Sequence, residues 1–197
     1  MIAIIDSGGA NIASVQFALE RLGAESILTK DVKIIQSANK VLLPGVGAAP
    51  IAMQNLAEYG LIDCIRGLTQ PVMGICLGMQ LLFAASPEGN TPLLGIFDAD
   101  CETFTPAQGR SVPHMGWNRL SKQQDHPLWA GVDEGAHVYF VHSYFAPVTA
   151  QTIATTSYGH DFTAIVGENN FMGCQFHPEK SGSVGAQILR NFLEIPS

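Results

Sequence analysis

The sequence predicts an α/β fold of three layers, in which helices cover both faces of a doubly wound, largely parallel central sheet with some antiparallel strands. Short apolar strands alternate with amphipathic helical stretches along the N-terminal half, as in crossover units over a parallel sheet. From Leu93 onward strand-like stretches follow one another, which favours some antiparallel pairing. The 197 residues, 47% of them hydrophobic, can close one sizeable core. We therefore expect a single domain over residues 1–197.

The N-terminal half supplies the strands that we expect to be parallel. A first strand is predicted over residues 1–6, and residues 12–22 carry apolar side chains at helical spacing before Gly23, a plausible helix stop. A short strand at 26–29 and a buried strand at 41–43 follow. These elements give the alternation of strand and helix that a doubly wound sheet requires.

The remaining elements continue this pattern and then depart from it. After a glycine-bearing turn at 44–47, helical periodicity resumes as far as about residue 68. The later elements are five strands and one amphipathic helix. We expect further strands at 71–75, 138–145, 152–157, 163–166 and 171–176, and a final helix at 183–194.

Composition narrows the classes of function. A formal net charge of −7 works against binding a polyanion, because nucleic-acid binders concentrate Lys and Arg, and we expect no nucleic-acid partner. The start has no basic leader, and its apolar run is too short for a membrane span, so we expect a cytoplasmic protein without a membrane partner. The four cysteines are widely scattered, which predicts free thiols and no metal site.

Cys76 lies in a turn that has the pattern of a nucleophile elbow. It joins the strand at 71–75 to a helical stretch, and Gly74 and Gly78 lie two residues to either side. Glycines let the backbone fold tightly and a substrate approach, and a helix N-terminus favours a thiolate. The competing interpretation is that Cys76 is an ordinary buried thiol.

His177 and Glu179 supply a base and a group that orients it. Pro178 between them ends the preceding strand. Residues two apart in an extended chain point the same way, so Glu179 can reach one ring nitrogen of His177 while the other faces a nucleophile. With Cys76, this predicts a nucleophile, a base and a carboxylate.

Acyl transfer also needs donors for a developing oxyanion. The backbone N–H of Leu77, directly after the nucleophile, is one candidate. The turn at 44–47 follows another strand of the same half, so the amide of Val46 or Gly47 is the second candidate.

The stretch 74–80, with its cysteine between glycines, followed about a hundred residues later by 175–179, resembles the triad-type class I glutamine amidotransferases. The resemblance implies that Cys76 attacks the side-chain amide of glutamine and that water later resolves a glutamyl thioester. It implies that His177 first takes the thiol proton and then protonates the departing ammonia, while Glu179 stabilises the imidazolium.

Two further segments, 112–118 and 140–144, are similar to the glutaminase subunits of imidazole glycerol phosphate synthases, and with 44–47 the likeness spans essentially the whole chain. The resemblance implies a heterodimer with a (β/α)8-barrel cyclase of histidine biosynthesis. That partner would use the ammonia to make imidazole glycerol phosphate and an aminoimidazole carboxamide ribonucleotide. No cofactor is implied.

The resemblance also assigns residues to the substrate and to the partner. The candidates to hold glutamine are Gln80, Glu88, Ser143 and Tyr144. The candidates for the partner face are His114, Asn118 and Lys180. Each of these residues also has a purely structural interpretation. Gln80 could be a solvated helix residue, Glu88 could lie in a plain surface turn, and Trp117, next to Asn118, could fill the core.

Three other functions remain open on the sequence. The first is the glutaminase of pyridoxal phosphate, anthranilate or nucleotide synthesis, against which the segment 114–118 argues. The second is an amidotransferase-like binding module without catalysis, which the intact Cys76, His177 and Glu179 disfavour. The third is a cysteine hydrolase that acts on amides without a partner.

Overall fold

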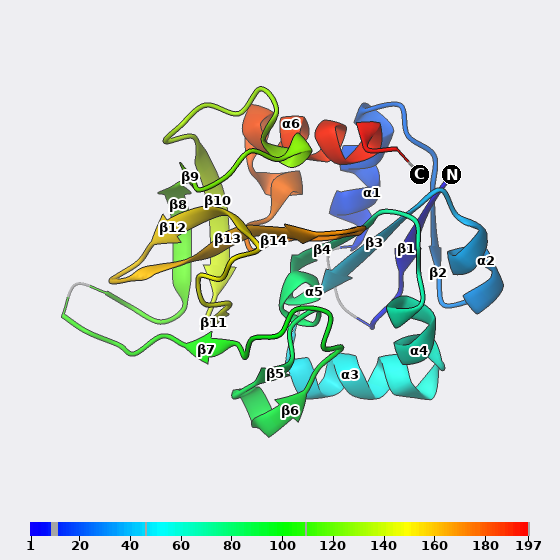
Figure 1. Cartoon of the computed structure of the whole chain (residues 1–197), viewed down its shortest axis with the longest axis horizontal. Helices are drawn as coiled ribbons and strands as arrows, with labels where there is room; N and C mark the ends of the chain where they lie inside the picture. Colours follow the sequence, from blue (N-terminus) through cyan, green and yellow to red (C-terminus); the bar gives the residue numbers. More distant parts are fainter. Residues whose placement is uncertain (9–11, 46, 109, 197) are drawn as a thin grey trace.

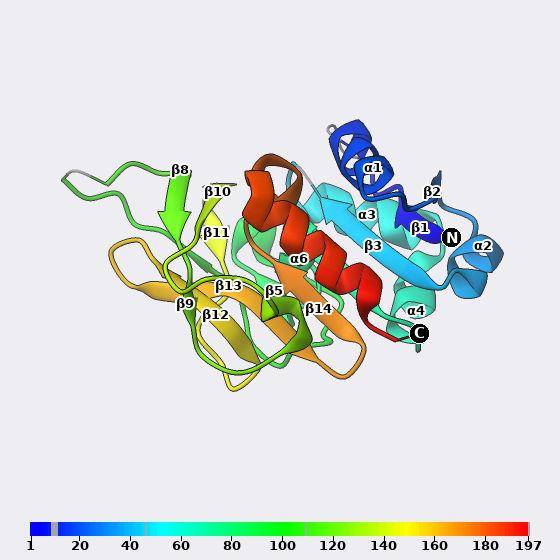
Figure 2. The ribbon, with the colours of Figure 1, turned by 90° about the horizontal axis from the view of Figure 1, so that it is seen from above.

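The computed structural model describes residues 1–8, 12–45, 47–108 and 110–196. Within them, an eight-stranded mixed sheet is covered by helices on both faces, as Figures 1 and 2 show. The predicted three-layer α/β architecture is therefore confirmed. The prediction of a single domain stays a prediction.

The central sheet has the strand order β2-β1-β3-β4-β14-β13-β12-β9. The neighbours from β2 to β14 pair in parallel and those from β14 to β9 pair antiparallel. The bounds, in the order of the sheet, are β2 Ser26–Thr29, β1 Ile2–Ile5, β3 Lys40–Gly45, β4 Val72–Cys76, β14 Phe171–Cys174, β13 Asp161–Glu168, β12 Thr152–Ser157 and β9 Ser121–Lys122. Because β4 and β14 are parallel neighbours, their carboxyl ends open at the same edge of the sheet, where ligands bind in open α/β folds.

Helices bury opposite faces of the sheet. In Figure 1, α1 (Ile12–Arg21) and α6 (Gly182–Glu194) lie above the sheet, and α3 (Ala49–Glu58) and α4 (Leu61–Arg66) lie below it. Side chains alternate between the faces along each strand. In β1, for example, Ile4 packs into the core under α1 and α6 and Ile5 into the core under α3 and α4.

Two helical details differ from the prediction. A short helix, α2 (Val32–Ser37), follows β2 and is capped by Asp31, whose carboxylate accepts from the N–H of Lys33 at 2.8 Å. Six residues are too few to show a clear helical period, although Asp31 is a typical N-cap residue. The expected helical stretch up to about residue 68 is broken at Gly60, which has a left-handed φ of 66° and separates α3 from α4.

Three short ribbons flank the sheet. The predicted strand at 138–145 is divided at Ser143 because its two parts pair with different strands. The ribbons are β10 (His137–His142) with β8 (His114–Arg119), β11 (Tyr144–Phe145) with β7 (Glu102–Thr103), and β5 (Ala85–Ser86) with β6 (Thr91–Pro92). The remaining short helices are α5 (Leu77–Gln80), η1 (Glu88–Asn90), η2 (Pro127–Trp129) and η3 (Pro178–Lys180).

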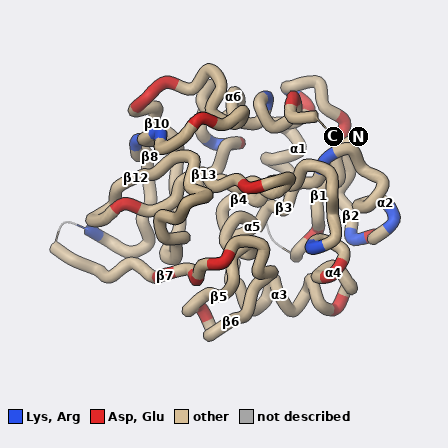
Figure 3. Tube along the Cα trace, in the orientation of Figure 1, with Lys and Arg blue, Asp and Glu red and all other residues tan. Residues whose placement is uncertain are grey.

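The charged residues are dispersed over the molecule. Figure 3 shows Lys and Arg on separate elements of the described chain, with Asp and Glu spread among the loops between them. The described helices are too short or too polar to cross a lipid bilayer. All four cysteines are free thiols, as predicted.

Candidate active site

Cys76 ends β4 with backbone angles that L residues rarely adopt, φ 55° and ψ −114°. Such conformations cost about 1–3 kcal/mol and persist where the surrounding structure enforces them, often at functional sites. The helix that follows, α5, has only four residues. That the N-terminus of this helix favours a thiolate at Cys76 stays a prediction.

Glycines on both sides of Cys76 allow backbone segments to touch. A Cβ at Gly74 would lie 2.5 Å from the carbonyl oxygen of Gly78, and a Cβ at Gly78 would lie 1.7 Å from that of Leu43 in β3. The predicted need for glycine at both positions is confirmed. The close contact also connects the nucleophile turn directly to the end of β3, just before the predicted oxyanion segment.

His177 reaches the same edge of the sheet from the end of β14. Its Nδ1 and Oε1 of Glu179 are 2.8 Å apart, and the two side chains are 4% and 1% exposed. The His177 backbone N–H donates to the carbonyl of Tyr139 at 3.0 Å, and its carbonyl accepts from the Ser181 hydroxyl at 2.7 Å. Hydrogen bonds therefore hold both the backbone and the ring of His177.

The environment of His177 favours the protonated ring. Burial opposes a positive charge, but hydrogen bonds and charge interactions with Cys76 and Glu179 outweigh it and raise the pKa of His177 to about 10. The site therefore stabilises an imidazolium beside the sulfur.

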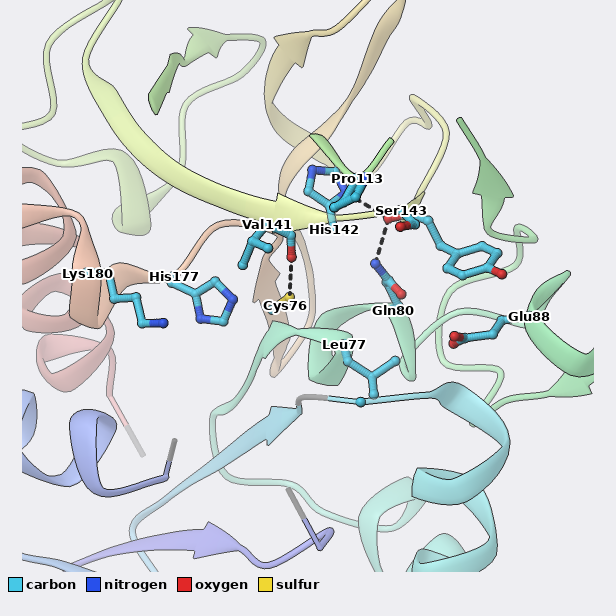
Figure 4. A pocket seen from close by; sticks show the side chains of 12 residues that line it. Cys76, Leu77, Gln80, Glu88, Pro113, Val141, His142, Ser143, His177 and Lys180 are labelled. Atoms are coloured by element: carbon cyan, nitrogen blue, oxygen red, sulfur yellow. Dashed lines mark hydrogen bonds between the residues drawn. The ribbon is translucent and has the colours of Figure 1, made fainter. Parts of the chain in front are cut away.

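A pocket of about 380 Å³ opens over Cys76, and its volume lies in the range of small-molecule sites. In Figure 4, His177 and Lys180 lie on one side of Cys76 and Glu88 on the opposite side. The residues that line it are Gly47, Cys76, Leu77, Gln80, Glu88, Pro113, Val141, His142, Ser143, Tyr144, His177 and Lys180. The structure thus brings together the predicted nucleophile, its base and every predicted substrate-binding residue. Of the two predicted donors in the 44–47 turn, Gly47 lines the pocket and Val46 lies outside the described residues.

Comparisons with known proteins agree with this geometry. The family model described as "Glutamine amidotransferase class-I" matches residues 3–195. The chain belongs to this family. It is 52% identical over 194 residues to the imidazole glycerol phosphate synthase subunit HisH of Xanthomonas axonopodis pv. citri, covering 98% of this chain and 97% of the relative. The identity to the protein of the same name from Shewanella oneidensis is 49% over 211 residues, with coverages of 98% and 96%.

Solved structures support the fold. The structure of PurLQS from Thermotoga maritima superposes with a TM-score of 0.72 at 18% identity, covering 98% of this chain and 96% of that one. A second solved structure, titled as a glutamine amidotransferase, gives a TM-score of 0.75 at 21% identity, with coverages of 98% and 97%. These two solved proteins, one of them titled as a glutamine amidotransferase, thus share the fold of this chain.

Gln80 is an interior residue in this amidotransferase. Its side chain is 4% exposed, so the alternative of a solvated helix residue is wrong. Its Nε2 donates to the Tyr144 carbonyl at 2.7 Å and to Oε1 of Gln175 at 2.9 Å. Gln80 therefore ties α5 to the wall of the pocket that Ser143 and Tyr144 form.

Two groups near the sulfur and one further residue of the pocket were missed by sequence reasoning. Gln175 Nε2 lies 3.7 Å from Cys76 Sγ, and the Val141 carbonyl lies 3.8 Å from it. His142 lines the same pocket. A signal for Gln175 was available, because it lies two residues before His177 on the same alternating face.

His142 belongs to a buried chain of hydrogen bonds that crosses the β8–β10 ribbon. His142 Nδ1 lies 2.8 Å from the Tyr144 carbonyl, which can only accept, so this nitrogen carries the proton. His142 Nε2 then accepts from His114 Nδ1 at 3.0 Å, and His114 Nε2 accepts from Asn118 Nδ2 at 3.2 Å. Burial lowers the pKa of His142 to about 3 and that of His114 to about 4. Both rings are therefore neutral at pH 7.

The candidates for the partner face separate into two groups. His114 is 3% exposed, so its assignment to a partner-facing surface is wrong, because the ring is enclosed between Asn118 and His142. Asn118 is half-buried and also donates to the Ser157 carbonyl at 3.0 Å. Lys180 is exposed beside the pocket. Trp117 is 57% exposed, which excludes the core alternative.

Glu88 lies in a turn that packs against α3. Its Oε2 accepts from the backbone N–H of Ala49 at 2.7 Å, and its own N–H donates to the Ser86 hydroxyl at 3.1 Å. The half-buried carboxylate lines the pocket, so the alternative of a plain surface turn is wrong.

Proposed function

We propose that this amidotransferase is the glutaminase subunit of an imidazole glycerol phosphate synthase. It hydrolyses glutamine to glutamate and ammonia, and it passes the ammonia to a (β/α)8-barrel cyclase subunit in histidine biosynthesis. The observation that carries the catalytic part is a cysteine held at φ 55° beside a buried His177–Glu179 pair, at the floor of a pocket. The HisH relatives, about half identical over nearly the full length, support the choice of pathway.

The chemistry begins at the sulfur of Cys76. The thiolate attacks the side-chain carbonyl carbon of glutamine, and His177 holds the proton that the thiol has lost. Negative charge that develops on the carbonyl oxygen meets backbone N–H groups, for which Leu77 and Gly47 are our candidates. Leu77 is the first residue of α5, so its N–H has no partner within that helix.

His177 then acts as an acid. The carbon–nitrogen bond breaks as the imidazolium gives its proton to the leaving nitrogen, which departs as ammonia. A water molecule, deprotonated by the now neutral His177, attacks the glutamyl thioester, and glutamate leaves as the thiol is restored. Glu179 accepts a hydrogen bond from the ring throughout and stabilises its charged form.

The rest of the pocket holds the substrate. Among the described residues that line it, Glu88 is the one carboxylate, which suits the α-ammonium group of glutamine. Ser143, Tyr144 and Gln80 form the adjoining wall. Lys180 and Asn118 remain the candidates for contact with the cyclase, and we expect the complex to work in the cytoplasm.

Glutamate release by the purified chain tests this proposal, measured alone and with a histidine-pathway cyclase plus its nucleotide ligand. We expect little turnover alone and strong stimulation in the complex, because uncoupled hydrolysis wastes glutamine. Cys76→Ala should abolish the glutamine reaction in the complex and leave synthesis from added ammonium salts intact, since only the source of ammonia is removed. Full turnover without the cyclase would favour a free-standing hydrolase or another pathway.

A further inference from the structure

We propose that Glu88 is a positioning residue that couples the binding of glutamine to the alignment of the oxyanion segment at Gly47. The inference rests on the proposed glutaminase function and adds a role for the hydrogen bond between Glu88 and Ala49. One oxygen of the Glu88 carboxylate would bind the α-ammonium group of the substrate, and the other would accept the hydrogen bond from the start of α3.

The start of α3 depends on Glu88 for its cap. The N-cap residue Ala48 offers no side-chain hydrogen bond, and the second helical residue is Pro50, which has no N–H to satisfy. The N–H of Ala49 donates instead to Oε2 of Glu88 at 2.7 Å. A carboxylate at a helix N-terminus is also favoured by the helix dipole. The side chain of Glu88 thus fixes the first peptide group of α3.

Gly47 lies only two residues before Ala49, so a displacement at Ala49 is transmitted to it through a very short piece of chain. Gly47 has a φ of 100°, lines the pocket and is one of the predicted oxyanion donors. The other end of this segment is fixed, because a Cβ at Gly45 would lie 2.6 Å from the backbone nitrogen of Gly78. The Glu88 hydrogen bond is therefore the adjustable end of a segment whose other end is locked.

The turn that carries Glu88 is itself held firmly. The Thr91 hydroxyl donates to the Glu88 carbonyl at 2.6 Å, and the Glu88 N–H donates to Ser86. Ser86 and Thr91 are 3% and 8% exposed. A Cβ at Gly89 would lie 2.5 Å from Cγ of Pro50, so the turn packs directly on the first turn of α3. The carboxylate group, rather than its backbone, is the part that can respond to a ligand.

The consequence is a substrate-dependent oxyanion site. A bound ammonium group fixes the orientation of the Glu88 carboxylate, and that orientation sets the Ala49 N–H and the peptide groups before it. Groups of a substrate remote from the reacting bond commonly raise kcat in this way, so substrates that lack them lose kcat as well as affinity.

Two substitutions separate the two functions of the carboxylate. Ala49→Pro removes the N–H and leaves the charge of Glu88, and proline suits this position because it is the first of a helix and Ala48 is extended, with φ −110° and ψ 141°. Glu88→Gln keeps an acceptor for Ala49 and removes the charge. Val32→Pro, at the first position of α2 after the extended Asp31, is the matched control for a proline at a helix start.

The assay is steady-state glutamate release by the full complex with its cyclase and nucleotide ligand, with glutamine and with glutaramate, which lacks the α-amino group. We expect Ala49→Pro to lower kcat for glutamine about tenfold while KM stays within about threefold. Glu88→Gln should raise KM about tenfold or more and also lower kcat about tenfold, because the amide no longer holds the ammonium group that sets the oxyanion segment. Val32→Pro should leave both constants unchanged.

The decisive measurement compares kcat for glutamine and for glutaramate in the unchanged protein and in Ala49→Pro. In the unchanged protein, glutaramate should have about a tenfold lower kcat than glutamine, and in Ala49→Pro this difference should shrink to within about twofold, because the coupling is already lost. Equal kcat losses from glutaramate in both proteins would overturn the proposal. If Ala49→Pro does not fold, the kcat of Glu88→Gln with glutamine decides: it should fall about tenfold, to the value that glutaramate has in the unchanged protein, and a rise in KM with unchanged kcat would overturn the proposal. Absence of any glutamate release from the unchanged complex would instead refute the proposed function.

Discussion

The two sides of the pocket are held in place by different kinds of contact. On the nucleophile side, backbone packs on backbone: a Cβ at Gly78 would come within 1.7 Å of the Leu43 carbonyl. On the opposite wall, side chains form a hydrogen-bonded chain from the half-buried Asn118 through the buried His114 and His142 to the Tyr144 carbonyl. The first side is rigid because no space is left, and the second because each polar group has a partner.

The difference predicts how each side fails. A contact between backbone atoms leaves no room for one additional methyl group, and it does not respond to pH. A chain of neutral hydrogen bonds tolerates a substitution that keeps donor and acceptor, but a proton added to either histidine breaks it. Substitutions on the nucleophile side should therefore cost most, and the opposite wall should be the part sensitive to acid.

Gly78→Ala should give the largest effect. The new methyl group must displace either β3 or the nucleophile turn, so we expect the free energy of unfolding to fall by about 3 kcal/mol or more, with loss of glutamine hydrolysis. Urea unfolding and the glutaminase assay measure both. Gly23→Ala is the control for a methyl group that clashes with nothing, because its Cβ meets no atom within 4 Å, and it should cost only the roughly 1–2 kcal/mol of an alanine at a φ of 75°. Near-normal stability of Gly78→Ala would contradict the claim that backbone packing leaves no free space on the nucleophile side.

Glu179→Gln should lower kcat by roughly 10² to 10³, because the amide cannot stabilise the imidazolium as the carboxylate does. Glu179 is one of the groups that raise the pKa of His177 to about 10, so its loss should lower that pKa. In the pH profile of kcat, measured in the complex, the transition that belongs to His177 should therefore move to lower pH. Glu20→Gln, at an exposed position of α1, is the control. An unchanged profile would show that Glu179 only packs behind the ring.

Acid should destabilise the wall that contains the two histidines. Burial lowers the pKa of His142 to about 3 and that of His114 to about 4, so in the unfolded chain, where His has a pKa near 6.5, these residues bind protons first as the pH falls. The unfolding free energy should therefore be intact above about pH 6.5 and fall by a few kcal/mol toward pH 4. Denaturant titrations across this range measure it.

The variant His114→Gln sharpens that experiment. It removes one titrating ring and keeps polar atoms that can replace part of the hydrogen-bonded chain, so the loss of stability between about pH 6.5 and pH 4 should be smaller. An identical dependence on pH in the variant and the original protein would assign the acid sensitivity to other groups.

The smallest perturbation is alkylation of the thiols. Burial raises the pKa of Cys64 and of Cys174, and together with nearby acidic residues it raises that of Cys101 to about 12. Cys76 lines the pocket beside His177. Brief treatment with iodoacetamide should therefore modify Cys76 first, as read by peptide mass spectrometry, without unfolding the protein. Preferential labelling of Cys64 would contradict the description of the pocket.

Local patterns predicted the fold class, most strands and the positions of the catalytic candidates. The spacing of Cys76 between two glycines and of His177 before Glu179 is visible in the sequence because each pair lies within one short segment. The wall from Asn118 to Tyr144 could not be predicted, since it depends on the pairing of β8 with β10, which places His114 opposite His142. For the same reason the sequence placed His114 wrongly at a surface.

The hydrogen bond from Ala49 to Glu88 shows the same limit. The two residues are 39 positions apart, and neither position has a local signal for the other. What decides the contact is the packing of the 86–91 turn on α3, which follows from the whole fold. Contacts of this kind between separate segments carry much of the site, and sequence spacing reports only those within a segment.

The most direct test of the central claim, that Cys76 forms a glutamyl thioester, is acid quenching of the complex during turnover with glutamine, followed by peptide mass spectrometry. A glutamyl adduct on the peptide that contains Cys76, absent from the Cys76→Ala variant, is the predicted result. Continued glutamate release by Cys76→Ala, or an adduct on a different cysteine, would contradict it.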